Sequence, residues 1–482
     1  MISVKANAAG LMLLSVLLLN ACAVGPDYQQ PETQLPPHFA NGGPAVFSEA
    51  DIDLGWWKQF NDSRLNELVR QTAEHNYQIQ AARANLAEAR ALYLEAGLNL
   101  FPQITSHGNY NNQERSASAL NNRGFAPRPL DLYNMGFDAT WEADFFGRIR
   151  RNVEASNDEV EGQEANLRDV GVSLIAETAR NYFQLRGLQR QLEVAERNAE
   201  NQSETLALTQ VKLDNGRGTE LDTSRALAQL ETTRATIPGL KTSIAAAIHR
   251  LSVLTGQIPD ALSNQLSEYQ ALPAAPAAIR ISSPEQLLKR RPDIKTAERA
   301  LAAATARVGV ATGDFFPRVT FVGNMSLEAS ELGHLTTAGS NSYAFGPRIS
   351  WAFLDMGRVY ARVKAAGARA ESSLAEYRQT VLNALEETEN ALVAYHQESI
   401  RRASLATAAQ ASEKANQLAH LRYQAGVADF LTVLDTELRL LEDQSELAQS
   451  ETSVATALTA IYKALGGGWE AALQESEVAP VN

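Results

Sequence analysis

The chain has 482 residues, a formal net charge of −13, 45% hydrophobic residues and 21% charged residues. This composition is close to the globular average, so it argues against general disorder and against a polytopic helical membrane protein. The acidic balance argues against a nucleic-acid-binding surface, because phosphate binding requires clustered Lys and Arg. The single cysteine excludes an internal disulfide and cannot build a zinc site alone.

The N-terminal apolar stretch, residues 8–19, is too short to span a bilayer core of about 30 Å as a helix. With Lys5 before it and Ala21 after it, the stretch is typical of a secretory signal peptide over residues 1–21. The letters LNAC, which end at Cys22, resemble the bacterial lipoprotein box. This resemblance implies that Cys22 becomes the mature N-terminus and carries a covalent lipid, an S-diacylglycerol with an N-acyl chain. The alternative is an ordinary signal peptide followed by a chance cysteine.

Two parts of the chain repeat one plan. The stretch 81–109 aligns with 296–324 at an offset of 215, and Trp141 aligns with Trp351 at an offset of 210. Such self-similarity predicts a tandem duplication. We expect a lipidated N-terminal segment 22–60, a first repeat 61–271, an extended linker 272–285, a second repeat 286–469 and a C-terminal tail 470–482.

Four segments alternate polar and apolar residues with a period of two, which is the pattern of a strand with one apolar face. The clearest is YNMGFDATWEADF at 133–145. One such strand alone is more often part of a soluble sandwich, but the rest of the sequence predicts no further sheet for these strands to pack against. Each segment is also long enough for the roughly 9 to 11 residues of a tilted membrane strand. We expect the strands at about 101–112 and 132–145 in the first repeat, and at about 316–327 and 341–354 in the second.

The remaining sequence predicts helices of unusual length. Residues 148–214 contain no proline, and as one helix they would reach about 100 Å, which a compact globule cannot contain. Two seams follow the 3-4 spacing of coiled coils. They are Leu185, Leu188, Leu192, Ala195 and Ala199, and Leu405, Ala408, Ser412, Ala415 and Ala419.

A glycine turn interrupts each long helix, near 214–222 and near 424–431. Each turn has a glycine in the position of a C-terminal helix cap, followed by a polar residue that fits an N-cap. The residues in these roles are Gly216, Thr219 and Asp222 in the first turn and Gly426 and Asp429 in the second. Each repeat is therefore expected to end in a helical hairpin.

Four membrane strands cannot close a barrel, and an open edge inside lipid leaves backbone groups unpaired at a cost of about several kcal/mol each. A barrel shared between chains removes the open edges. Two copies would supply eight strands and three copies would supply twelve, and single-chain barrels are known from eight strands upward. The strand pattern alone does not distinguish a dimer from a trimer.

Six motifs occur in order along the chain: VGPDY, WWKQFNDSRLNELV, FFGRIRR, RRPDI, FFPRVT and YKALGGGW. Together they resemble the TolC-like outer-membrane factors of tripartite efflux systems, most closely the lipid-anchored branch typified by OprM and OprN. The resemblance extends from Cys22 to about Trp469. It implies an α+β membrane protein that forms a homotrimer, with a twelve-stranded β-barrel in the outer membrane, four strands per chain, continued by a long α-helical, coiled-coil-like periplasmic barrel.

The resemblance also implies partners and a function. The partners are a periplasmic adaptor (membrane fusion) protein, an inner-membrane transporter of the resistance-nodulation-division (RND) class, and outer-membrane lipid. The function is a passive exit duct for drugs or other small toxic compounds, as in multidrug resistance. A different class, a lipid-anchored coiled-coil scaffold or adhesin without a pore, explains the signal and the helices but not the duplicated strands.

Proteins of this family are closed at their periplasmic end by residues of the motif Leu-Thr-x-Leu-Asp. The motif reads LTVLD in this chain, so the resemblance implies a gate at Leu431 and Asp435. A three-fold Leu ring is an apolar constriction, and a three-fold Asp ring repels itself and binds cations or protons. Tyr423 and Asp429 flank the turn and are expected to add hydrogen bonds that hold it shut. Related proteins carry a second acid where this chain has Thr432. The alternative is that Leu431 packs the hairpin and Asp435 is a solvated helix residue.

The resemblance suggests a second role for the turn glycines Gly216, Gly218 and Gly426, as contacts for the adaptor. No catalytic constellation is expected, because the seven histidines are dispersed and neither His-Glu-x-x-His nor a glycine-rich phosphate loop after a strand occurs. We therefore expect no enzymatic activity, no metal and no cofactor other than the covalent lipid.

Overall fold

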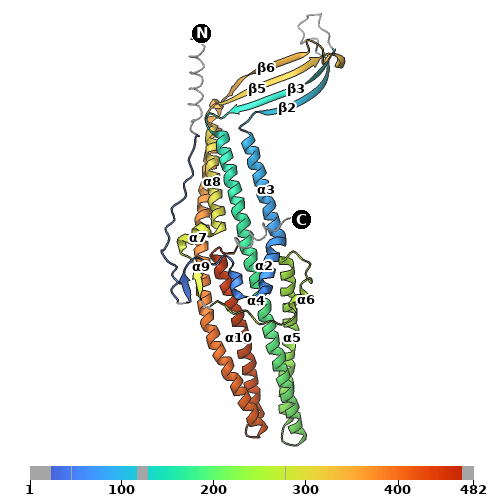
Figure 1. Ribbon diagram of the computed structural model, residues 1–482, viewed down its shortest axis with the longest axis vertical. Coiled ribbons are helices and arrows are strands. Elements are labelled where there is room, and N and C mark those ends of the chain that lie inside the picture. The colour runs from blue at the N-terminus through green and yellow to red at the C-terminus, as the bar shows by residue number, and fades with distance from the viewer. Residues whose placement is uncertain (1–22, 45, 115, 117–128, 277, 469–482) are drawn as a thin grey trace. The chain divides into compact units, whose positions relative to one another are not determined.

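A computed structural model describes residues 23–44, 46–114, 116, 129–276 and 278–468. The chain divides into two compact units, each built from three stretches (Figure 1). Unit 1 comprises residues 1–32, 85–163 and 296–378, and unit 2 comprises 33–84, 164–295 and 379–482. Within the described ranges, no helix combines the length and the apolar character needed to cross a bilayer.

The helices are, in chain order, η1 (Trp56–Phe60), α2 (Ser63–His75), α3 (Tyr77–Leu98), α4 (Arg148–Asp214), α5 (Glu220–Leu254), α6 (Ser263–Leu266), α7 (Pro284–Arg290), α8 (Pro292–Gly313), η3 (Leu332–His334), η4 (Phe353–Asp355), α9 (Met356–Gln424) and α10 (Phe430–Ala464). The strands are β1 (Phe47–Glu49), β2 (Gln103–Glu114), β3 (Pro129–Ala143), β4 (Ile279–Ile281), β5 (Arg318–Ala329) and β6 (Asn341–Ser350). Helix α4 is the single long helix expected over 148–214, and α5 continues through Pro238.

The four long strands form one antiparallel sheet in unit 1, in the order β2-β3-β5-β6. The expectation of four strands with one apolar and one polar face is confirmed. Cross-strand pairs such as Phe137 with Met325 place the apolar residues on one face, and these side chains are largely exposed in the single chain. The exposed apolar side chains of this face include Ile104, Tyr110, Met135, Phe137, Phe321, Met325, Tyr343, Phe345 and Ile349.

The duplicated tryptophans make the same contact in both repeats. Trp141 donates its indole N–H to the carbonyl of Leu100 at 2.9 Å, and Trp351 donates to the carbonyl of Phe315 at 3.0 Å. Each bond joins the end of a strand to the helix end that precedes its partner strand. The internal duplication is therefore present in side-chain contacts as well as in the sequence.

The first described residues, Ala23 to Tyr28, lie along unit 1. The backbone N–H of Val24 donates to the carbonyl of Phe146 at 3.1 Å, and the buried Arg151 pairs with Asp27. Tyr28 donates to Glu298 at 3.1 Å. Gly25, with φ +98°, lies against the backbone of Gly309 so closely that a Cβ would collide with it. The VGPDY motif is therefore bound to the starting turns of α4 and to α8.

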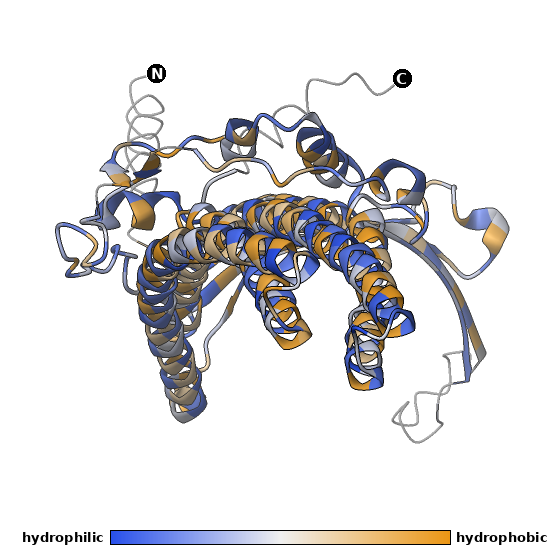
Figure 2. Ribbon diagram, turned by 90° about the horizontal axis from the view of Figure 1, so that it is seen from below, coloured by the Kyte–Doolittle hydropathy of each residue, from blue (hydrophilic) through white to orange (hydrophobic). Residues whose placement is uncertain are grey.

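Unit 2 contains α4 from Glu164 onward with α5, and α9 from Gln379 onward with α10, together with α2, η1 and α7. Hydrophobic and hydrophilic residues are interleaved along the helices (Figure 2), as expected where one stripe of each helix packs and another faces solvent. Its core includes the fully buried Leu65, Ile175, Tyr182, Phe183 and Leu251.

Two features of unit 2 were not expected from the sequence. Strands β1 and β4 form a parallel pair, in which Phe47 faces Ile279, so three residues of the expected linker form a strand of a second, two-stranded sheet. In the second seam, Ala415 is exposed and Asn416 is buried instead. Asn416 is tolerated there because its side-chain carbonyl accepts a hydrogen bond from Thr436 at 3.1 Å.

Three of the sequence motifs meet in unit 2. Trp56 of WWKQF stacks on Tyr462 of YKALGGGW at 5.0 Å between ring centroids. Arg291 of RRPDI donates to the carbonyl of Ala464 at 2.7 Å and pairs with Glu387 of α9 at 2.9 Å. Gly466 approaches the backbone of Arg291 with φ +72°. The buried guanidinium is thus satisfied by the carboxylates of Glu387 and Asp293 and by the Ala464 carbonyl, which lies just before the turn at Gly466.

The substitution Gly466→Ala is expected to destabilise unit 2 by about 1–2 kcal/mol, because a Cβ is strained at positive φ and would lie 3.2 Å from the Cα of Arg291. The thermal midpoint of the helical circular dichroism signal in detergent measures the effect. Gly239→Ala is the matched control: this glycine lies inside α5 with no atom within 4 Å of an added Cβ. It should gain about 0.5–1 kcal/mol. Equal midpoints for the two variants would contradict the assigned role of Gly466.

Candidate functional site

The first-repeat turn ends α4 in a Schellman motif. The N–H of Gly216 donates to the carbonyl of Leu213 at 2.9 Å, and that of Arg217 donates to Lys212 at 2.8 Å. Gly216 has φ +69°, which a glycine adopts without strain. Helix α5 then begins with the expected capping box, in which the Thr219 hydroxyl accepts from the N–H of Asp222 at 3.2 Å.

The second-repeat turn repeats this geometry. Gly426 has φ +72°, and its N–H donates to the carbonyl of Tyr423 at 3.1 Å. Asp429 is the N-cap of α10, as expected, and accepts from the backbone N–H and the hydroxyl of Thr432 at 3.0 and 2.7 Å. These bonds hold the pKa of Asp429 below its usual value. The cap is therefore retained at neutral pH and is lost only as the pH falls through that lowered value.

A threonine and an aspartate three residues apart cap each return helix, but in opposite order. The N-cap is Thr219 in α5 and Asp429 in α10. Asp222 accepts from the Thr219 hydroxyl at 2.7 Å, the same distance as between Thr432 and Asp429. Thr432, the position where related proteins carry a second acid, therefore has a structural partner inside its own turn. Gly218 differs from the other turn glycines, because its φ is not positive and an added Cβ would lie 3.0 Å from the backbone nitrogen of Leu213.

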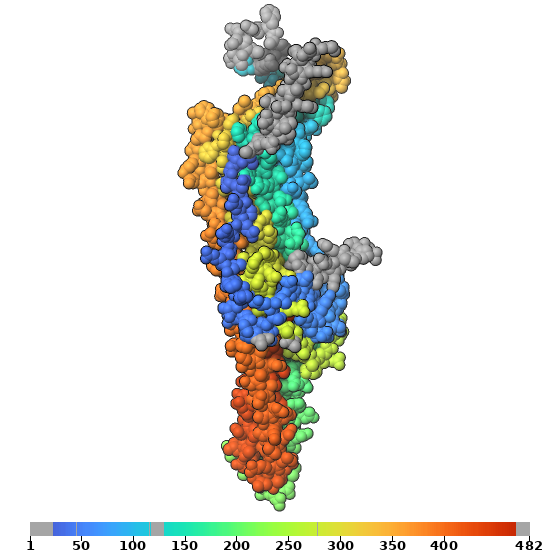
Figure 3. Space-filling view, turned by 60° about the vertical axis from the view of Figure 1, so that its left-hand side comes forward, coloured from blue at the N-terminus to red at the C-terminus, as the bar shows by residue number. Residues whose placement is uncertain are grey.

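Tyr423 lies inside a small core at the turns. It is 5% exposed and belongs to a cluster with Ala226, Ala419, Phe430 and Val433, which come from α5, α9 and α10. Burial raises the pKa of its hydroxyl. In the space-filling view, the turn of α4–α5, in green, lies beside the orange-to-red hairpin of α9 and α10 (Figure 3). Tyr423 thus joins the two hairpins by packing, which the sequence did not indicate.

Lys212 is a residue that sequence reasoning missed. From the last turn of α4, its ammonium group donates to the carbonyl of Tyr423 and lies 3.4 Å from the centroid of the Tyr423 ring. A cation is favourable there, because the carbonyls at the end of α9 carry partial negative charge. Burial lowers the pKa of this ammonium, and the nearby Arg217 lowers it further.

A polar contact farther along the hairpins was also missed. Glu437 of α10 is 4% exposed. It accepts from the hydroxyl of Thr205 of α4 at 2.6 Å and pairs with His420 of α9 at 3.0 Å. A buried carboxylate is stable only when paired in this way. The sequence signal for this contact is the position of Glu437 between the apolar Val433 and Leu440, at the 3-4 spacing of a buried stripe.

Leu431 and Asp435 lie on the opposite side of α10 from this core. Leu431 is 54% exposed, and Asp435 is exposed with no hydrogen bond or ion pair among the described residues. Because they are four residues apart on one helix, their side chains share a face. Within the single chain, Leu431 does not pack the hairpin, and this face is left free for contact outside the chain.

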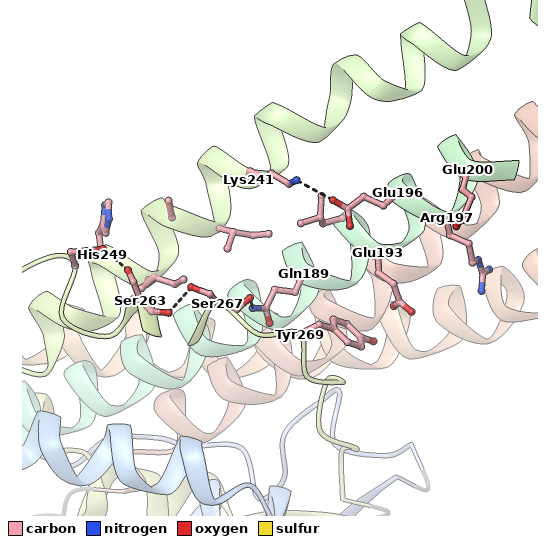
Figure 4. Close-up of a pocket in the computed structure, with 15 residues that line it drawn as sticks. Gln189, Glu193, Glu196, Arg197, Glu200, Lys241, His249, Ser263, Ser267 and Tyr269 are labelled. Carbon is pink, nitrogen blue, oxygen red and sulfur yellow. Dashed lines mark hydrogen bonds and ion pairs between the residues drawn. The ribbon is translucent and has the colours of Figure 1, made fainter. Parts of the chain in front are cut away.

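A groove of about 650 Å³ lies between α4, α5 and the loop around α6 (Figure 4). Three of its charged side chains form ion pairs: Lys241 pairs with Glu196 at 3.1 Å, and Glu193 pairs with Arg190. Ser263 donates its hydroxyl to the carboxylate of Asp260 at 2.5 Å, at the start of α6. In the part of the chain that the structure describes, no group of three or more His, Cys, Asp or Glu side chains is placed to hold a metal.

The lipidation site expected at Cys22 lies outside the described residues, as do the signal peptide and the tail 470–482. The described site is therefore a pair of glycine-capped hairpin turns, joined by Tyr423 and Lys212, with Leu431 and Asp435 on an exposed face. Such an arrangement can form a contact or a constriction.

Known proteins with this architecture are outer-membrane channels. The family described as outer membrane efflux protein matches residues 68–257 and 283–467. Nodulation protein T of Rhizobium leguminosarum bv. trifolii is 30% identical over 94% of this chain and 96% of its own length. The cation efflux system protein CusC of Escherichia coli O6:H1 is 29% identical over 94% of this chain and 97% of its own.

Among solved structures, the outer-membrane channel OprN superimposes with a TM-score of 0.87 at 40% identity, covering 93% of this chain and all of its own. The match extends over both repeats and includes the strands and the hairpins. The chain belongs to the outer membrane efflux protein family.

Proposed function

We propose that the chain is the outer-membrane channel of a tripartite efflux system and serves as a passive exit duct for drugs or other small toxic compounds. The observation that carries this proposal is the sheet of unit 1. It has one apolar and one polar face, and its outer strands β2 and β6 have no further partner among the described strands. A scaffold without a pore leaves that apolar face unexplained.

The open edges favour a barrel shared between copies. In lipid, the unpaired N–H and C=O groups of β2 and β6 would cost about several kcal/mol each, and pairing β2 of one copy with β6 of the next removes this cost. We propose a homotrimer with twelve strands, in which the apolar face contacts lipid and the polar face lines the lumen. The long hairpins then form the periplasmic duct.

We propose that Leu431 and Asp435 close the duct at its periplasmic end, each repeated three times around the axis. Their shared exposed face supports this role, and so does the lack of a partner for Asp435 among the residues that the structure describes. Tyr423 and Asp429 hold the turn from within the chain, Asp429 as the helix cap and Tyr423 through packing. The exposed turns with Gly216, Gly218 and Gly426 are the proposed contacts for a periplasmic adaptor, which connects the duct to an inner-membrane RND transporter.

Cys22 is the proposed lipid attachment site. The lipid would contribute a membrane-binding free energy of about 0.8 kcal/mol per buried methylene. This adds to the binding of the barrel, which is itself inserted in the membrane. We propose that it tethers the chain to the outer membrane without a part in transport.

The purified full-length protein is expected to migrate as a trimer that resists sodium dodecyl sulfate and to conduct ions in planar bilayers. The reason is that only closure of the sheet between copies satisfies its edges in lipid. Semi-native electrophoresis and single-channel recording measure the two properties. If trimers with native helical content never conduct ions, the proposed channel function is wrong.

The substitutions Leu431→Ala and Asp435→Ala are each expected to raise the single-channel conductance of the trimer several-fold, because each removes part of the constriction. Asp260→Asn is the control, since this acid lies in the loop before α6, far along the chain from the turns, and should leave the current unchanged. If both tip variants conduct like the parent, the gate lies elsewhere.

Lys212→Met is expected to loosen the turns and to raise the frequency of channel opening. The variant keeps the apolar stem but loses both the bond to the Tyr423 carbonyl and the contact with the Tyr423 ring. The matched control is Lys241→Met, which breaks a surface ion pair with Glu196 on the same hairpin. The same opening frequency in both variants would refute a special role for Lys212.

A further inference from the structure

The last described residues of the chain are packed against the core of unit 2. A Cβ added to Gly467 would lie 2.8 Å from Cδ1 of Ile52, and one added to Gly468 would lie 3.0 Å from Nε1 of Trp56. The chain therefore leaves the described structure beside Trp56, with residues 469–482 still to follow. We call residues 469–482 the C-terminal segment.

Trp56 has a buried hydrogen-bond donor that lacks an acceptor. Its side chain is 0% exposed, and its indole N–H has no partner among the residues that the structure describes. The contact with Tyr462 is a stack of the two rings and does not use the N–H. Buried donors in native proteins are almost always paired. Because Gly468 lies directly beside this nitrogen, the residues that follow Gly468 are placed to supply the acceptor.

A basic pocket lies next to the point at which the chain leaves the described structure. It has a volume of about 390 Å³ and is lined by residues of α4, α7 and α8. A Cβ added to Gly466 would lie 3.5 Å from the carbonyl oxygen of Arg290, whose side chain lines the pocket. The charged residues of the lining are four bases and one acid: Arg168, Lys289, Arg290, Lys295 and Asp51.

Arg290 is the base of this pocket that is left for a ligand. It is half-buried and forms no hydrogen bond or ion pair within the described part of the chain. Lys289 pairs with Glu285 at 2.7 Å, but both side chains are largely exposed, and such a surface pair contributes little. Arg168 and Lys295 also have partners. A carboxylate is the natural ligand for a guanidinium in this position.

The C-terminal segment has the charge that the pocket lacks. It reads WEAALQESEVAPVN, with Glu470, Glu475 and Glu477 and without Lys or Arg. Its reach is sufficient, because Glu470 follows Gly466 by only four residues, and an extended chain spans up to about 3.5 Å per residue. The chain length, the position of the chain end and the charges therefore favour the same occupant.

We propose that the C-terminal segment binds to unit 2 of its own chain. An acceptor at the start of the segment receives the indole N–H of Trp56, and the glutamates bind in the basic pocket at Arg290. The segment thereby holds the end of α10 to α4, α7 and α8. The inference concerns the chain itself and does not depend on the proposed channel function.

The test is disulfide cross-linking in the full-length protein with Gln286→Cys and Ser476→Cys. Gln286 is exposed and lines the pocket. The sequence has one other cysteine, Cys22, which we propose carries the lipid, so the introduced thiols are the free ones. The matched control replaces Gln286→Cys with Leu54→Cys, an exposed position between Ile52 and Trp56 that does not line the pocket. Mass spectrometry of peptides measures the yield, which we expect to be at least about threefold higher for the pocket pair.

The charges and the indole donor are tested in the same cross-linking assay. Arg290→Glu should lower the yield of the pocket pair several-fold, and adding Glu475→Lys with Glu477→Lys should restore it, which excludes a folding defect. Lys241→Glu makes the same charge change elsewhere on unit 2 and should leave the yield unchanged. Trp56→Phe keeps an aromatic ring but removes the donor, so it should lower the yield about twofold.

Three results would overturn the inference. The first is a yield for the pocket pair no higher than for the Leu54→Cys control, which would leave the pocket to another anion such as an acidic polymer. The second is an unchanged yield in Arg290→Glu. The third is cross-linking between chains, seen as dimers on a denaturing gel, because the segment would then bind a second copy. Conductance of the trimers tests the proposed function separately, whatever the yield.

Discussion

Backbone hydrogen bonding at the edges of a single sheet determines the architecture. Strands β2 and β6 end the order β2-β3-β5-β6, and the apolar face of the sheet carries large exposed side chains such as Phe345 and Ile349. Water would form hydrogen bonds with the free backbone groups at the edges but would be an unfavourable environment for the apolar face. Lipid would solvate the apolar face but would leave the backbone groups at the edges unpaired. Only further strands at both edges satisfy both requirements, so the chain is built to be completed by its own copies.

The parts of the fold that follow from local pattern were predictable. The period of two in 133–145 predicted β3, and the proline-free residues 148–214 predicted one long helix, which α4 is. The glycine caps and the Thr219 capping box followed from spacing of three or four residues. These features depend on residues that are close together in the chain, so their patterns can be recognised in the sequence itself.

The parts that depend on distant neighbours were not predictable. Strands β1 and β4 have three residues each and are too short for a periodic signal. Asn416 and Ala415 both fit a seam of small residues, and only the Thr436 partner decides which is buried. Lys212 lies 211 residues from the Tyr423 carbonyl that it binds. No spacing rule connects residues that meet only after two hairpins have packed.

The docked N-terminal stretch has a geometric consequence for the membrane. Ala23 follows Cys22 directly, at the roughly 3.8 Å between consecutive Cα atoms, and Val24 is bonded to Phe146 beside the foot of β3. The first described residues are therefore fixed beside the end of the sheet. A lipid attached directly before them, as we propose for Cys22, would have only a short tether, and the depth of the strands in the bilayer would be coupled to the position of its headgroup.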